Sequence, residues 1–125
     1  MRKSIVCVDD DRTILDLFRA TLGREHSLDL HSCPEHALKA FHPLRTDLLI
    51  TDHQLGNHLT GHDLIQRVRG IGYTGPVLLL SSAPPQLDYC RQGLEIPLAY
   101  NYPFAQKGGN FPKVRRAIYS LLALQ

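Results

Sequence analysis

Acidic and hydroxyl side chains stand directly after three short apolar runs of this sequence. They are Asp9, Asp10 and Asp11 after the first run, Thr51 and Asp52 after the second, and Ser81 and Ser82 after the third. Because the carboxyl ends of parallel strands meet at one edge of an α/β sheet, we expect these side chains to share one rim. Carboxylates gathered in this way repel one another unless a cation joins them. The pattern therefore indicates a metal site.

Magnesium is the cation that suits these oxygen ligands. Mg²⁺ prefers hard oxygen donors, keeps several waters, and often bridges carboxylates and a substrate phosphate. A phosphoryl group on Asp52 would complete such a shell, and a hydroxyl from Ser81 would donate to the phosphoryl oxygens. We therefore expect phosphate chemistry at this rim.

The same residues also have purely structural interpretations. Asp11 is well placed to cap the helix that follows, where an acidic side chain complements the helix dipole, and we accept that role for it. Asp9 and Asp10 follow a buried strand and a third acid ends another strand, which favours a site over a cap. For Ser81 and Ser82 the structural alternative is a polar strand exit and turn.

The histidines near this rim do not form a recognisable metal motif. The spacings between His53, His58 and His62 match no strong zinc signature, and Gly56 and Gly61 lie among them. We interpret these histidines as solvated loop residues.

Short apolar runs alternate along the chain with stretches of helical spacing, which is typical of βαβ units around a parallel sheet. Strands are expected at residues 5–8, 28–31, 48–50, 77–80 and 98–101. Helices are expected around 14–22, 34–42, 64–70 and 111–122, with a weaker fourth helix between Pro84 and Gly93. Gly23 is expected to end the first helix in a left-handed cap.

The apolar pattern also predicts which strands are central. Residues 48–50 and 77–80 are continuous apolar runs, which strands covered by helices on both faces require, so we expect them beside the first strand. Residues 28–31 are more polar and are expected to form an edge strand.

Length and composition fit one globular domain covering residues 1–125, with 43% hydrophobic and 21% charged residues. A net charge of +2 is too balanced for a nucleic-acid binder, and we interpret the cluster at Lys113, Arg115 and Arg116 as a solvated helix face. No apolar run is long enough to span a membrane, and no export signal is visible. Three cysteines without a Cys-x-x-Cys spacing fit reduced thiols, so we expect a cytoplasmic protein.

Across almost its whole length the chain resembles the receiver domains of two-component response regulators, the chemotaxis receivers among them. The matching segments are Ile5-Val-Cys-Val-Asp-Asp-Asp11, Asp47-Leu-Leu-Ile-Thr-Asp-His-Gln-Leu55, Gly61, Pro76-Val-Leu-Leu-Leu-Ser-Ser82 and Pro103-Phe104. The resemblance implies a flavodoxin-like, doubly wound (βα)5 fold whose five-stranded parallel sheet has the order 2-1-3-4-5.

The resemblance also implies a role for each residue of the rim. Asp52 would be the phosphoacceptor, Asp10 a direct Mg²⁺ ligand, and Asp9 would act mainly through water. The backbone carbonyl of Gln54 would be a further metal ligand, and Ser81, five residues after the proline, the switch hydroxyl. The phosphoryl donor would be a histidine kinase or a phosphotransfer protein. Such a domain is a signalling switch in a phosphorelay, and its catalysis is confined to its own phosphorylation and dephosphorylation.

The sequence departs from the family pattern after the last strand. The family normally has a lysine before the Pro-Phe pair, and Tyr102 stands there instead. Because the site then loses one positive charge, we expect it to depend more heavily on Mg²⁺, with Tyr102 offering at most an uncharged hydrogen bond. Lys107 lies beyond the proline, and nothing in the sequence aims it at the site. Ala99 stands where an aromatic switch residue is usual, with Tyr100 one step later.

The loop after Asp52 departs as well. It is one residue longer than the commonest receiver pattern, and Gly56 replaces the usual proline. The sequence Asp52-His-Gln-Leu-Gly56, with Thr60-Gly61 following, is similar to that of receivers attached to hybrid kinases.

Other functions stay open at this point. Tyr102 raises the alternative of a pseudo-receiver, a binding module with weak or no phosphorylation. Asp9-x-Asp11-x-Thr13 also resembles the nucleophile motif of haloacid-dehalogenase-type phosphatases, although Asp88 and Glu95 are poorly placed to supply their later acidic motif. An FMN protein of the same sheet order is excluded, because three aspartates after the first strand would repel its phosphate.

Overall fold

The computed structural model describes residues 2–56, 59–81, 87–91, 94–97, 103–106 and 111–123. The strands in this part of the chain are β1 (Ser4–Val8), β2 (Ser27–His31), β3 (Leu48–Asp52), β4 (Val77–Ser81), β5 (Leu87–Arg91), β6 (Leu94–Pro97) and β7 (Phe104–Gln106). The helices are α1 (Arg12–Leu22), α2 (Pro34–Ala40), α3 (Gly61–Gly70) and α4 (Phe111–Ala123).

These strands form one sheet in the order β2-β1-β3-β4-β7-β6-β5. The pairs from β2 through β7 are parallel, which confirms the α/β fold class and the expected order 2-1-3-4. β2 is the predicted edge strand, and β3 lies beside β1 as expected. β4 pairs with β3 and not with β1, so it is the next strand outward.

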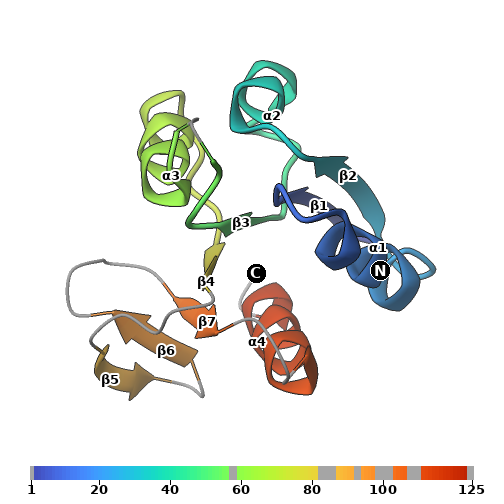
Figure 1. Cartoon of the computed structure of the whole chain (residues 1–125), viewed down its shortest axis with the longest axis vertical. Helices are drawn as coiled ribbons and strands as arrows, with labels where there is room; N and C mark the ends of the chain where they lie inside the picture. Colours follow the sequence, from blue (N-terminus) through green and yellow to red (C-terminus); the bar gives the residue numbers. More distant parts are fainter. Residues whose placement is uncertain are drawn as a thin grey trace.

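Helices cover both faces of the sheet (Figure 1). On the face of α1 and α4, Ile5, Cys7 and the helix side chains form one core, in which the rings of Phe18 and Phe111 lie 5.8 Å apart. On the face of α2 and α3, Val6 and Val8 belong to a second core, where Phe41 meets the edge of Tyr73 at 5.1 Å. Successive residues of β1 thus alternate between two cores, which is why this run is continuously apolar.

Local sequence sets the helix ends. The Asp11 carboxylate accepts the Thr13 N–H at 2.9 Å and caps α1, as predicted. Gly23 ends α1, but with φ −67° it is right-handed, so the left-handed cap predicted there is wrong. Its N–H instead continues the helical pattern by donating to the Arg19 carbonyl at 3.1 Å. Pro34 opens α2, which ends at Ala40, two residues earlier than expected.

The fourth predicted helix is wrong. Residues Leu87–Arg91 and Leu94–Pro97 form an antiparallel hairpin that extends the sheet beyond β7. Both Leu87-Asp88-Tyr89 and Leu94-Glu95-Ile96 place a charged residue between two apolar or aromatic residues. Only two residues, the second of them a glycine, separate the paired strands. Alternation with such a short connection favours a hairpin over a helix.

The fifth parallel strand is β7, at Phe104–Gln106, which pairs with β4 from Leu79 to Ser81. The strand predicted at residues 98–101 lies outside the described residues. Pro103 stands immediately before β7, and its carbonyl accepts the Leu79 N–H at 3.0 Å. Among the described helices, none is both long and apolar enough to cross a bilayer.

Candidate functional site

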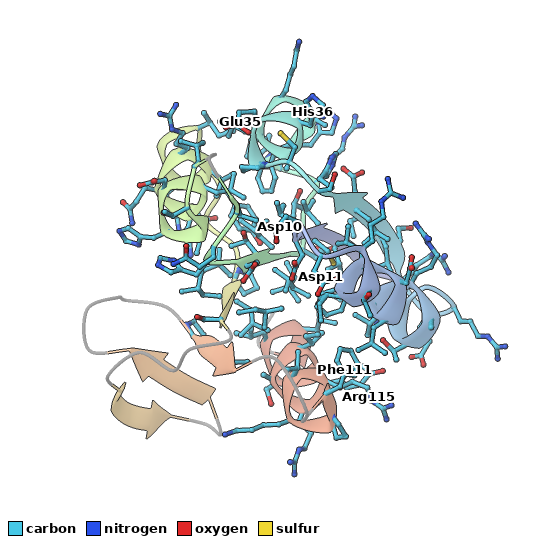
Figure 2. The ribbon with its side chains drawn as sticks, viewed as in Figure 1. Asp10, Asp11, Glu35, His36, Phe111 and Arg115 are labelled. Carbon is cyan, nitrogen blue, oxygen red and sulfur yellow. The ribbon has the colours of Figure 1, made fainter. Side chains whose placement is uncertain are left out.

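Three carboxylates meet at the carboxyl ends of β1 and β3. Asp9, Asp10 and Asp52 each place one carboxylate oxygen within 4.8 Å of the others. Asp9 and Asp52 are buried, with 0% and 3% of their surface exposed, whereas Asp10 is exposed. Figure 2 labels Asp10 and Asp11 in the middle of the view, where the chain leaves β1 and enters α1. The structure thus brings together the acids that the strand-end pattern singled out.

The turn after β1 fixes Asp9. Its backbone N–H donates to the His31 carbonyl at 3.0 Å, which continues the pairing of β1 with β2 by one residue. Its carboxylate oxygen Oδ1 accepts the Asp11 N–H at 2.8 Å. Because Asp11 uses its own carboxylate to cap α1, the acid that joins Asp9 at the rim is Asp10. The Asp9 and Asp11 pair of the phosphatase motif is therefore not the pair that converges.

Asp52 is the last residue of β3, and three hydrogen bonds hold the backbone of Asp52 and His53. The His53 N–H donates to the Leu80 carbonyl of β4 at 2.8 Å. The buried Thr51 hydroxyl donates to the Asp52 carbonyl at 3.0 Å. The loop that follows is closed at its base, since the Gly61 N–H donates to the His53 carbonyl at 2.9 Å. These contacts hold the backbone in place where β3 ends.

Gly61 allows this closure because it has no side chain. A Cβ at this position would collide with the Asp52 carbonyl oxygen and would lie 2.9 Å from the Leu79 side chain. Sequence reasoning noted Gly61 only as part of a motif, and it gave Thr51 no role beyond its place at the strand end. Both residues contact the backbone of Asp52: the Thr51 hydroxyl donates to its carbonyl, and Gly61 lies against that carbonyl.

The remaining predicted site residues are placed as follows. Ser81 ends β4, is buried, and lies one residue beyond Leu80, the register partner of Asp52. Gln54 is exposed two residues after Asp52. Gly56 has φ +71°, a left-handed conformation that proline cannot adopt. Ser82, His58, Ala99, Tyr100, Tyr102 and Lys107 lie outside the described residues.

His53, the residue after Asp52, lies in surroundings that disfavour a charged imidazole. Burial lowers its pKa below the usual 6.5 and the nearby His62 lowers it further, while Asp63 acts in the opposite direction.

The donor set fits a hard divalent cation. Carboxylates supply all three converging groups, without a histidine or a thiol among them, and such a set suits Mg²⁺ better than Zn²⁺. Two buried carboxylates held within 4.8 Å of a third also need a counter-charge to remain ionised.

A family model described as the response regulator receiver domain matches residues 5–99. This chain belongs to the response regulator receiver family. The matched range covers the Asp9, Asp10 and Asp52 rim and Ser81, and it ends before Tyr102. Receivers of this family are signalling switches and not enzymes of the usual kind.

Solved receiver structures share the fold. The signal receiver domain of an HD domain-containing protein from Pseudomonas fluorescens has a TM-score of 0.75 and 20% identity, with 98% of this chain and 96% of that chain covered. The chemotaxis protein CheY4 of Vibrio cholerae has a TM-score of 0.77 and 17% identity, with 97% and 99% covered.

A third similar structure is the response regulator TrrA of Thermotoga maritima, solved in complex with Mg²⁺ and BeF. It has a TM-score of 0.72 and 22% identity, with 95% of this chain and 98% of that chain covered. No match was found among curated proteins. At these identities the solved structures establish that this receiver has the receiver fold.

Proposed function

We propose that this receiver accepts a phosphoryl group on Asp52 from a phosphohistidine of a histidine kinase or phosphotransfer protein, and that the modified rim switches protein binding. The observation that carries the proposal is the convergence of Asp9, Asp10 and Asp52 within 4.8 Å at the ends of β1 and β3. Membership of the receiver family supports it.

Asp10, the Asp52 carboxylate and the backbone carbonyl of Gln54 would hold Mg²⁺, with Asp9 acting through water. A bound Mg²⁺ would neutralise the carboxylates and draw negative charge from the phosphoryl oxygens. The Mg²⁺ and BeF complex of the Thermotoga maritima regulator supports this assignment.

The chemistry at Asp52 is a transfer between two nucleophiles. One Asp52 carboxylate oxygen attacks phosphorus, a P–O bond forms, and the P–N bond to the donor imidazole breaks, leaving that ring with the bonding electron pair. The hydrogen bonds at the Asp52 carbonyl and the His53 N–H hold the backbone that carries the attacking carboxylate, which would lower the entropic cost of the in-line approach. The Ser81 hydroxyl would donate to a phosphoryl oxygen and so couple β4 to the state of Asp52.

We further propose that residues 1–125 form one receiver domain that works in a reducing cytoplasm. Cys7 is fully buried, and burial raises the pKa of its thiol, so it stays an unreactive core residue. Cys33 donates from its thiol to the Glu35 carboxylate at 3.0 Å.

Phosphorylation by a small donor tests the assignment of Asp52. After incubation with acetyl phosphate and Mg²⁺, intact-mass spectrometry should detect one added phosphoryl group, and peptide mapping should place it on Asp52. Asp52→Asn should abolish the adduct. Asp16→Asn, which changes an exposed acid on α1, should leave it unchanged.

Two results would contradict the proposal. Wild-type rates in Asp52→Asn would place the acceptor elsewhere. No adduct in the wild-type protein, with Mg²⁺ present, would favour the pseudo-receiver alternative that Tyr102 suggests. Tyr102→Lys then separates the causes, because recovery of phosphorylation would attribute the inert site to the missing lysine.

A further inference from the structure

The outer edge of β2 offers unused backbone groups. Among the described strands, β2 is the last on its side of the sheet (Figure 1). It pairs with β1 over five residues without a bulge. The Ser27 N–H donates to the Lys3 carbonyl, and the His31 carbonyl accepts from Asp9, so residues 27 and 31 turn toward β1. Because strand residues alternate, the N–H and C=O groups of Leu28 and Leu30 turn outward.

The sequence of β2 protects this edge only through the exposed Asp29. It reads Ser-Leu-Asp-Leu-His, with neither proline nor lysine. Edges of this kind are templates for the addition of another strand.

A basic groove runs along the α1 side of this edge. One hollow is lined by Arg2, Arg19, His26 and Leu30, and the next by Arg12, Asp16, Arg19 and Leu30. The shared Arg19 and Leu30 make the two hollows continuous. Arg12 and Arg19 are two helical turns apart and therefore share one face of α1.

The charge of the groove is positive. Three exposed arginines face one carboxylate, that of Asp16, which lies 3.4 Å from Arg19. The side chains of this pair are 71% and 67% exposed, so the contact is weak and Arg19 stays available to another carboxylate. Arg2 uses part of its guanidinium on Ser27 and on the Arg24 carbonyl.

A second, less charged hollow lies on the α2 side of β2. Val6 and Ala40 give it an apolar floor, and Asp29, His42 and Arg45 line it as well. The two faces of an added strand would thus meet different surroundings. Acidic side chains would suit the α1 side, and small apolar side chains would suit the α2 side.

We propose that the β2 edge binds an extended acidic segment of a partner protein by strand addition. Its alternate residues are acidic and face Arg2, Arg12 and Arg19, and the residues between them are small and apolar. Same-face side chains of a strand are about 6.8 Å apart, so three alternate acids span about 14 Å. Arg12 and Arg19 are seven residue steps apart, which is about 10.5 Å of helix, so one such segment passes both arginines.

Charge favours this occupant over a second copy of the chain. Antiparallel pairing of two β2 edges about Asp29 would set the two Asp29 carboxylates opposite each other and bring two arginine grooves together. The inference is independent of Asp52, because the groove lies along the sheet edge and contains none of the rim acids.

The test uses the wild-type protein and a fluorescein-labelled peptide of alternating Glu and Val residues, followed by fluorescence anisotropy. Binding should weaken as salt is added. Only one alternate set of peptide N–H groups can reach β2, so N-methylation of that set should weaken binding at least about tenfold and N-methylation of the other set should change it little. In hydrogen exchange, the peptide should slow the amides of Leu28 and Leu30 but not that of Asp29.

Arg19→Glu should weaken binding by roughly three- to tenfold, because one exposed attraction becomes a repulsion. Arg116→Glu on the exposed face of α4 is the matched control and should bind normally. Both variants should still take up phosphate from acetyl phosphate, so a failure of the peptide test is distinguishable from a failure at Asp52.

Three outcomes would overturn the proposal. They are equal effects of the two N-methylated sets, equal binding by Arg19→Glu and Arg116→Glu, and a protein dimer, seen by ultracentrifugation, that the peptide cannot dissociate and whose formation protects the same Leu28 and Leu30 amides.

Discussion

The contact between Gly61 and Asp52 is the tightest constraint at the proposed phosphoacceptor. Asp52 ends a buried strand, and the first residue of α3 lies against its carbonyl, where a Cβ does not fit. Any side chain at residue 61 must move either the start of α3 or the end of β3. The position of Asp52 therefore depends on a residue that contributes no functional group.

Gly61→Ala should lower the free energy of unfolding by about 1–3 kcal/mol, because backbone atoms must shift to relieve the collision. Acetyl phosphate should then label Asp52 more slowly than in the wild-type protein. Urea denaturation and the labelling rate measure the two effects.

Gly70→Ala is the matched control for this prediction. A Cβ at Gly70, the last residue of α3, meets nothing within 4 Å, so alanine there should be neutral or stabilising by up to about 1 kcal/mol. An equal loss of stability in both variants would show that the loss does not come from the contact with Asp52.

At the residue scale, the sequence predicted the groups that carry charge but not the groups that support them. Asp9, Asp10 and Asp52 were found because parallel strands end at one rim, a rule that needs no coordinates. The role of Gly61 depends on a loop closed by its bond to His53, and that closure cannot be derived from spacing. The chemical roles proposed for the acids and for Ser81 remain predictions.

At the scale of elements, α3 owes its start to a reciprocal cap. The Thr60 hydroxyl accepts the Asp63 N–H at 3.1 Å, and the Asp63 carboxylate accepts the Thr60 N–H at 3.2 Å. Hydrogen bonding of the Asp63 carboxylate to the Thr60 backbone N–H, and also to the Thr60 side chain, lowers the pKa of Asp63 below 3.8. The cap stands immediately before Gly61, so it also fixes the residue that contacts Asp52.

Thr60→Ala should destabilise the protein by about 1 kcal/mol, since it removes the N-cap acceptor. The stability that the Asp63 carboxylate contributes through the cap should fall as the pH is lowered. Its folded pKa is depressed, so its contribution is complete above the unfolded value of 3.8 and is lost as the pH falls through the lower folded pKa.

Urea denaturation of Asp63→Asn and wild-type protein measures this dependence. The difference in stability between them should shrink as the pH is lowered into this acid range. A difference that stayed constant with pH would assign the effect to packing and not to the ionised cap.

The elements themselves were predictable where pattern and packing agree. β1, β3 and β4 are continuous apolar runs because two cores flank them, and α1, α3 and α4 have one apolar face. The helix predicted after Pro84 failed because two prolines and a later glycine were taken as helix limits. The alternation of charged with apolar or aromatic residues in β5 and β6 favours the hairpin that these residues form.

At the scale of the whole molecule, the sheet joins two separate cores and carries the three rim acids where β1 and β3 end. Leu48 and Ile50 of β3 pack on one side while Leu49 packs on the other, so the strand that bears Asp52 is anchored from both faces. The rim acids repel one another on this rigid frame, and the frame cannot relax to separate them.

In metal-free buffer, Asp10→Asn should therefore raise the melting temperature, because it removes one of three neighbouring charges. Saturating Mg²⁺ should reverse the ranking, stabilising the wild-type protein by about 2.7 kcal/mol at a hundredfold excess over Kd and the variant much less.

Thermal denaturation in EDTA and in Mg²⁺ checks this ranking. Ca²⁺ and Na⁺ at matched ionic strength separate specific binding from screening. The same melting temperature for both proteins in all buffers would remove the basis for a cation at these carboxylates.

The hydrogen bond from Gly61 to His53 has a further consequence for how this chain tolerates change. This hydrogen bond closes the loop from His53 to Gly61, so the two ends of the loop stay together whatever residues lie between them. The entropy of closing a ring grows only with the logarithm of its length, so one additional residue costs on the order of 0.1 kcal/mol. A segment of this kind should thus tolerate one residue more or fewer while Asp52 keeps its place.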